Sequence, residues 1–103
     1  MDTLIAPVIS ALKENHASVD SDEVSRAFVA ARDAHEGQLR KSGEPYITHP
    51  VAVAEILAHL GLNPATIIAA LLHDTVEDTS YSLTQLRTDF GDEIANLVDG
   101  VTK

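Results

Sequence analysis

The sequence predicts an all-α fold, and three observations support this. Apolar residues recur every three or four positions along most of the chain, which is the period of a helix with one buried face. No stretch shows the sustained apolar–polar alternation that a half-buried strand would need. Proline and glycine stand where helices would begin and end, as at Pro64, Gly61 and Gly91. These boundaries predict a bundle of about six helices joined by short loops.

The first two predicted helices run from about Leu4 to Lys13 and from about Ser21 to Glu36. Pro7 suits the first of them because it lies near the first turn, where an amide hydrogen has no intrahelical acceptor. The second carries a continuous apolar stripe, and Asp20 with Glu23 can form a capping-box-like start.

An irregular segment, Gln38 to His49, is predicted next, because Gly43 and Pro45 interrupt it and its polar residues give it no face to bury. Pro50 is expected at the first position of the following helix, which Gly61 ends.

The remaining predicted helices begin at clear caps. Asn63 followed by Pro64 opens a helix that extends through His73. Ser82 with Gln85 forms a capping box for the next one. The last segment runs from Asp92 to Lys103 and has apolar residues on one face: Ile94, Leu97, Val98 and Val101.

Composition limits the class of protein. The 103 residues include 45% hydrophobic residues and no cysteine, so we expect residues 1–103 to form one small domain without disulfides or thiolate metal sites. No apolar run approaches ~18 residues, so the sequence predicts no membrane span. The N-terminus, Met1 to Leu4, lacks signal-peptide features, and the expected location is cytoplasmic.

The net charge is −9, from 16 acidic and 7 basic residues. An acidic surface repels DNA and anionic membranes, which proteins usually bind through clustered lysine and arginine, so we expect neither as a partner. Arg40 and Lys41 form the only adjacent basic pair in the sequence. Such a pair is either a solubilising loop or a local anion site.

The most informative motif is His73-Asp74-Thr75-Val76-Glu77-Asp78, which follows an apolar run. On a helix, Glu77 lies one turn beyond His73 and Asp78 one turn beyond Asp74, so the four titratable side chains share one edge. Imidazole and carboxylate together are donors for one divalent cation. The alternative interpretation is a solvated acidic helix end.

The five histidines are not equivalent. His16 and His59 are expected at the surface, and His35 is expected to be packed or hydrogen-bonded beside an apolar face. His49 precedes a predicted helix start, and two antiparallel helices could bring it to His73 and Asp74. Two imidazoles and one carboxylate suit Mn²⁺, Fe²⁺ or Zn²⁺ better than Ca²⁺ and leave positions open for water and substrate. Acidic groups beyond them could then orient or deprotonate water.

The segment from Arg40 to Tyr46 adds an independent signal. Arg40 and Lys41 can pair with phosphate, an arginine or Tyr46 can stack on a base, and Gly43 lets the backbone approach closely. Alone, the segment could be a mobile polar turn. Together with the candidate metal ligands, the segment favours an interpretation of the protein as an enzyme that hydrolyses phosphoesters.

Three segments closely resemble the hydrolase domain of the RelA/SpoT stringent-response family: Ala34–Pro50, Ala69–Thr79 and Phe90–Lys103. The resemblance extends from about Ser21 to Lys103, in register. It implies an HD-domain-like helical bundle and a metal-dependent (p)ppGpp hydrolase, alone or within a bifunctional synthetase/hydrolase.

The resemblance also implies roles for individual residues. Removal of the 3′ pyrophosphate from guanosine tetra- or pentaphosphate would return GDP or GTP. Three residues match Mn²⁺ ligands: His49, His73 and Asp74. Glu77 and Asp78 match the acidic pair that activates water. Nucleotide-binding residues in the matching loop are Arg40, Lys41, Ser42 and Tyr46.

The family pattern includes a further aspartate ligand downstream of the last matching segment, beyond Lys103. The bundle is therefore expected to be incomplete, as a fragment or as a short form with an incomplete site, and activity of these residues alone is open. One alternative is a non-catalytic module that acts in self-association, as a homodimer through the apolar face of the last helix, or in regulation. Another is hydrolysis of a different nucleotide, such as NADPH.

Overall fold

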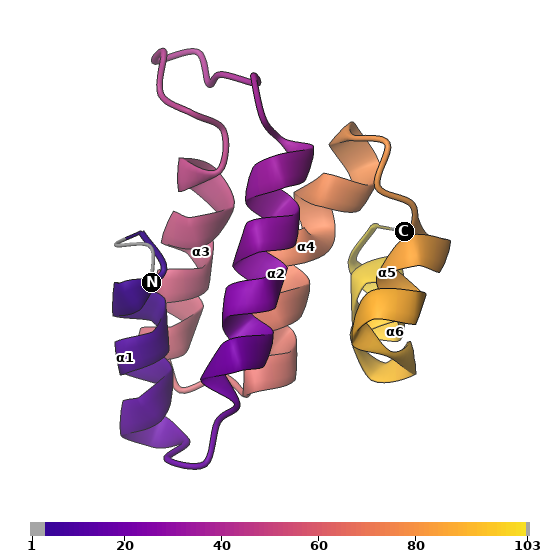
Figure 1. Cartoon of the computed structure of the whole chain (residues 1–103). Helices are drawn as coiled ribbons and strands as arrows, with labels where there is room; N and C mark the ends of the chain where they lie inside the picture. Colours follow the sequence, from indigo (N-terminus) through magenta and orange to yellow (C-terminus); the bar gives the residue numbers. More distant parts are fainter. Residues whose placement is uncertain (1–3, 103) are drawn as a thin grey trace.

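Helices form the framework of the computed structural model, which describes residues 4–102 and their side chains as far as residue 100. Within the described residues the helices follow one another in the chain order that Figure 1 labels. Their bounds are Ala6–Asn15 (α1), Ser21–Ala34 (α2), Thr48–His59 (α3), Pro64–Asp78 (α4), Leu83–Phe90 (α5) and Asp92–Thr102 (α6). The predicted all-α fold is confirmed.

The central helix of the bundle is α4. It packs against α2, α3 and α6, while α1 packs against α3 and α5 against α6 (Figure 1). The part of α4 that enters the core is apolar, and Ile67, Ile68, Leu71 and Leu72 are fully buried. Burying a side chain of this size stabilises a fold by about 1.5–3 kcal/mol, so α4 is held firmly by its neighbours.

Side-chain caps set the start of three helices, as the sequence predicts. The Asp20 carboxylate accepts the amide hydrogens of Asp22 and Glu23 at the start of α2, at 3.0 and 3.3 Å. Asn63 accepts the amide of Thr66 at 2.9 Å, and Ser82 accepts that of Gln85 at 3.0 Å. These bonds satisfy amide groups that have no acceptor within the helix.

The start of α3 differs from the prediction. The helix begins at Thr48, two residues before Pro50. The amides of Thr48 and His49 donate to the carbonyls of Pro45 and Tyr46, at 3.1 and 3.0 Å, so the first turn forms ahead of the proline. Pro50 costs no hydrogen bond in this turn. His49 therefore lies within α3 and not before it.

The segment between α2 and α3 is more regular than predicted. The Arg40 amide donates to the Glu44 carbonyl at 2.8 Å, and the Tyr46 amide donates to the Gln38 carbonyl at 3.0 Å. Leu39 and Pro45 form an isolated antiparallel bridge. Residues 38–46 therefore form a small hairpin, and Gly43 at its turn has a φ of +91°, a conformation that glycine adopts readily. Figure 1 shows it at the same end of the bundle as the end of α4.

The apolar face of α6 is partly covered within the fold, and self-association through it stays a prediction. Ile94 and Val98 are 4% and 0% exposed and belong to the core, whereas Leu97 is 38% exposed. The side chain of Val101, and Lys103, lie outside the described residues. Among residues 4–102, no helix combines the length and apolar character needed to cross a bilayer.

Candidate metal centre

Three potential ligands come together on the last turns of α4. His73, Asp74 and Glu77 each offer a donor atom, and the three donors lie within 4.8 Å of one another. His73 Nδ1 is 3.3 Å from Asp74 Oδ1, and His73 Nε2 is 3.6 Å from Glu77 Oε2. The two ring nitrogens of His73 face different carboxylates, and only one of them can bind a given ion, so the distances show a cluster of potential donors on one helix edge.

A second helix brings another imidazole to the same carboxylate. His49, in the first turn of α3, has its Nε2 3.8 Å from Asp74 Oδ2. Asp74 thus lies between His73 and His49, which α4 and α3 supply separately. The packing of α3 against α4 produces this meeting, as expected from the sequence.

A cavity of about 390 Å³ opens beside these side chains. Its walls combine the candidate metal ligands His49, His73 and Asp74 with apolar residues of α3, α4 and α6. The lining residues are His49, Pro50, Val53, Leu57, Thr66, Ala69, Ala70, His73, Asp74 and Leu97. A mostly apolar hollow with a few convergent polar groups is the usual form of a small-molecule site.

Tyr46 connects the hairpin to the metal-binding residues. Its hydroxyl donates to Asp74 Oδ2 at 3.0 Å, and its ring lies edge-on to His49 at 5.9 Å between centroids. The pKa of Tyr46 is raised to about 12, first by burial, then by this hydrogen bond and by the charges of Asp74 and Asp78, with the charge of Arg40 acting in the opposite direction. The phenol therefore lies within electrostatic reach of both carboxylates and of the arginine.

Other predicted site residues lie further out. Lys41 and Ser42 are exposed near the hairpin turn, and the Ser42 hydroxyl donates to the Glu44 carboxylate at 3.3 Å. Neither lines the cavity beside the metal-binding residues. Asp78 is exposed at the end of α4, and its carbonyl accepts a hydrogen bond from Gln38 at 3.4 Å. The hairpin thus brings its basic residues to this end of the bundle without inserting them.

The remaining histidines separate as expected. His59 is exposed, with its Nε2 3.7 Å from Glu55 on the same helix. His16 is partly exposed and its ring lies 3.4 Å from the Gly61 carbonyl. His35 is buried and hydrogen-bonded, and it contacts Thr75, a buried polar residue that the sequence analysis did not single out.

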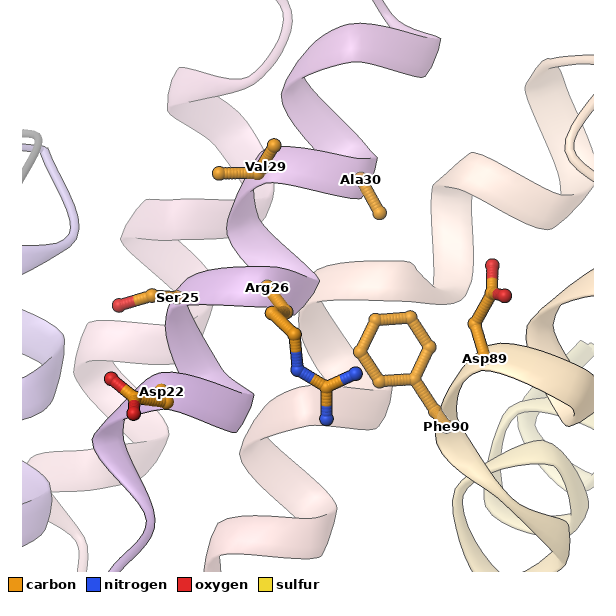
Figure 2. Close-up of a pocket in the computed structure, with 7 residues that line it drawn as sticks. All are labelled: Asp22, Ser25, Arg26, Val29, Ala30, Asp89 and Phe90. Carbon is orange, nitrogen blue, oxygen red and sulfur yellow. The ribbon is translucent and has the colours of Figure 1, made fainter.

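A second, more open cavity of about 650 Å³ lies between α2 and α5 (Figure 2). Arg26 lies over the ring of Phe90, 5.4 Å from its centroid. Hydrogen bonds from Tyr81 and Gln85 lower the pKa of Asp89, and the charge of Arg26 lowers it further. Arg26 and Asp89 therefore have partners within the fold, and no histidine lines this cavity.

The fold and the His–Asp pair are those of a known class. The sequence matches the HD domain family over residues 27–103, and the chain belongs to that family. The relatives confirm the more particular resemblance to the RelA/SpoT family.

Three of these relatives show the extent of the similarity. A probable GTP pyrophosphokinase of Mycobacterium leprae is 54% identical over 100 residues, covering 97% of this chain and 13% of the relative. A guanosine-3′,5′-bis(diphosphate) 3′-pyrophosphohydrolase of Haemophilus influenzae is 63% identical over 73 residues, 71% of this chain and 11% of the relative. The bifunctional (p)ppGpp synthase/hydrolase SpoT of Escherichia coli is 55% identical over 85 residues, 80% of this chain and 12% of the relative. The chain therefore spans a small part of each.

Proposed function

We propose that this chain supplies the metal-binding part of a (p)ppGpp 3′-pyrophosphohydrolase. The observation that carries the proposal is the convergence of His49 and His73 on Asp74, beside a cavity and a basic hairpin. Relatives named as (p)ppGpp hydrolases support the choice of nucleotide. The proposed products are pyrophosphate and GDP or GTP.

The donor set suits a divalent ion of intermediate hardness, and we propose Mn²⁺ held by His49, His73 and Asp74. Bound there, the ion would supply Lewis-acid catalysis. One of Glu77 and Asp78 then accepts a proton from the attacking water, whose oxygen bonds to the phosphorus of the released pyrophosphate. As the bond from that phosphorus to the ribose 3′-oxygen breaks, the 3′-oxygen takes up a proton and becomes the hydroxyl of GDP or GTP.

The proposed role of the hairpin is to bind the nucleotide. Arg40 and Lys41 pair with its phosphates, since guanidinium and ammonium groups bind phosphate oxygens strongly. Ser42 adds a hydroxyl donor, and Tyr46 adds an aromatic face next to Asp74. We further propose that residues 1–103 act as one cytoplasmic domain and that the acidic surface excludes DNA as a partner.

The direct test is metal binding by calorimetry. We expect His73→Ala to abolish Mn²⁺ binding, because it removes the imidazole that faces both Asp74 and Glu77. His59→Ala is the matched control, since His59 is exposed and pairs only with Glu55 in the described contacts. A wild-type chain with no Mn²⁺ affinity, or a His73→Ala variant that binds like the wild type, contradicts the proposal.

Activity is tested by chromatography of ppGpp after incubation with the chain and Mn²⁺. We expect low turnover to GDP and pyrophosphate, because the described residues bring together fewer ligands than the family pattern implies. Activity that survives His73→Ala would contradict the assignment of the site.

A further inference from the structure

His35 is a polar residue in an apolar core, and its contacts lie on three segments. It is 2% exposed at the C-terminal end of α2. Its Nδ1 is 2.9 Å from Gln38 Oε1, and its Nε2 is 3.3 Å from the hydroxyl of Thr75 on α4. Its ring also packs on Tyr46, at 4.6 Å between centroids. Buried polar groups that are fully satisfied hold their surroundings in one arrangement.

The Asp78 carbonyl decides which group donates and which accepts in each of the hydrogen bonds that link Gln38, His35 and Thr75. The Asp78 carbonyl can only accept, so the Gln38 amide nitrogen faces it, at 3.4 Å. The Gln38 oxygen therefore faces His35 and accepts the proton on Nδ1. In the neutral imidazole Nε2 then accepts the proton of the Thr75 hydroxyl. The result is a directed chain from Thr75 through His35 and Gln38 to Asp78.

These hydrogen bonds hold the hairpin against α4, the helix that carries the candidate metal ligands. The two ends of the hydrogen-bond chain lie on α4, where Thr75 directly follows Asp74 and Asp78 is the last residue. Gln38 begins the hairpin, and its own carbonyl accepts the Tyr46 amide at 3.0 Å. Most other residues of the hairpin are exposed, so these bonds and the Tyr46 hydroxyl are what fix its orientation.

We propose that His35 and Gln38 are positioning residues that hold the nucleotide-binding hairpin against the end of α4. The role rests on the proposed function, because it assumes that the hairpin binds ppGpp. The metal-binding side chains come from α3 and α4, whose packing does not depend on Gln38. Replacing the Gln38 side chain keeps the bond between the Gln38 carbonyl and the Tyr46 amide, and the Tyr46 hydroxyl still reaches Asp74. Loss of the Gln38 side-chain bonds should therefore weaken nucleotide binding and leave Mn²⁺ binding almost unchanged.

The test compares two identical replacements in the 103-residue chain. Gln38→Met removes the amide at a half-buried position, which avoids emptying the core as a change at His35 would. Gln85→Met is the control, because the Gln85 amide donates to Asp89 at 3.0 Å on an exposed surface of α5. Both variants are measured for melting temperature, for Mn²⁺ affinity by electron paramagnetic resonance, and for ppGpp affinity with Mn²⁺ by calorimetry.

We expect Gln38→Met to weaken ppGpp binding roughly tenfold, the scale on which loss of a supporting residue acts, with Mn²⁺ affinity within about twofold of wild type. Gln85→Met should change neither. Equal losses of Mn²⁺ affinity, ppGpp affinity and melting temperature would show a merely structural residue and overturn the proposal.

The positioning role and the proposed function fail in different ways. A wild-type chain that does not bind ppGpp overturns the proposed function, and the positioning role with it. Unchanged ppGpp affinity in Gln38→Met, with wild-type binding intact, overturns only the positioning role. Long-range ¹H–¹⁵N spectra of the histidine rings give a separate readout: a His35 proton on Nε2 in place of Nδ1 would overturn the hydrogen-bond chain.

Discussion

Asp74 receives contacts from several directions, and each of its oxygens has a different set of neighbours. Oδ1 faces His73, whereas Oδ2 accepts the Tyr46 hydroxyl and lies near His49. A carboxylate held by a hydrogen bond keeps the orientation that a metal ion requires. Tyr46 is therefore tied to the metal-binding group as well as available to a nucleotide, a role that its position in the hairpin sequence did not suggest.

Removing the Tyr46 hydroxyl should weaken metal binding. We expect Tyr46→Phe to lower Mn²⁺ affinity about tenfold, because the ring still packs on His35 while Asp74 loses its donor. Calorimetry measures the affinity, and circular dichroism checks that the fold is kept. Wild-type affinity in Tyr46→Phe would show that Asp74 needs no such support.

The two tyrosines of the chain should both resist ionisation in the folded state. The pKa of Tyr46 is raised to about 12, and burial with the hydrogen bond to Asp89 raises that of Tyr81 further. A folded-state pKa above the unfolded value gives stability that is complete below about pH 10 and is lost as pH rises through the folded pKa.

We therefore expect the metal-free chain to show little tyrosinate absorbance at 295 nm at pH 11, where the same chain in denaturant is about 90% ionised. The urea midpoint should also fall as the pH rises from about 10 toward 12. A normal titration near pH 10 in the folded protein would contradict both shifts.

At the scale of elements, local signals predicted the helices well and contacts between elements less well. The caps at Asp20, Asn63 and Ser82 lie within three residues of the amides they bind, so the sequence displays them directly. The hairpin and the early start of α3 were missed, because their backbone bonds depend on how the segment folds over the bundle. The bond between His35 and Thr75 joins residues 40 apart, and no periodicity reveals it.

In the candidate metal centre, too, the features within one helix could be predicted from the sequence, while contacts that depend on the folding of the hairpin could not. The spacing of His73, Asp74 and Glu77 on one helix was visible in the sequence, and the structure brings their donors together. The approach of His49 followed from an expected antiparallel packing. The orientations of Lys41 and Ser42 could not be foreseen, because they depend on the turn at the tip of the hairpin.

The Asn63 cap at the start of α4 can be tested for its contribution to the stability of the fold. Asn63→Ala removes the acceptor for the Thr66 amide and should lower the free energy of unfolding by about 1 kcal/mol. Asn63→Asp keeps an acceptor and should retain most of the stability. Urea denaturation measures both variants, and equal stability of Asn63→Ala and wild type would contradict the role of the cap.

At the scale of the whole molecule, the described residues leave several large apolar side chains exposed. The most exposed are Ile56 on α3 at 61%, Leu60 just after that helix at 72%, and Leu39 on the hairpin at 66%. Ile56 and Leu60 lie four residues apart and so face the same side of α3. Exposed apolar surface favours association.

We predict that the chain self-associates through this side of α3. Light scattering over a range of concentrations should show a dimer, and the double variant Ile56→Glu and Leu60→Glu should be monomeric with an unchanged melting temperature. Thr84→Glu, on the exposed side of α5, is a control that should keep the dimer. A wild-type chain that stays monomeric would contradict the prediction.

The central place of α4 has a consequence for changes in chain length. Its fully buried apolar residues end at Leu72 and its candidate metal ligands begin at His73, on one uninterrupted helix. One residue inserted between Ile68 and His73 would turn everything after it by about 100° and advance it by ~1.5 Å, moving His73 and Asp74 away from His49. Four inserted residues would return them to nearly the same side but about one turn too far along the axis. The connection between α1 and α2 lies largely exposed and carries no proposed site residue, so length variation in related chains should be found there and not in α4.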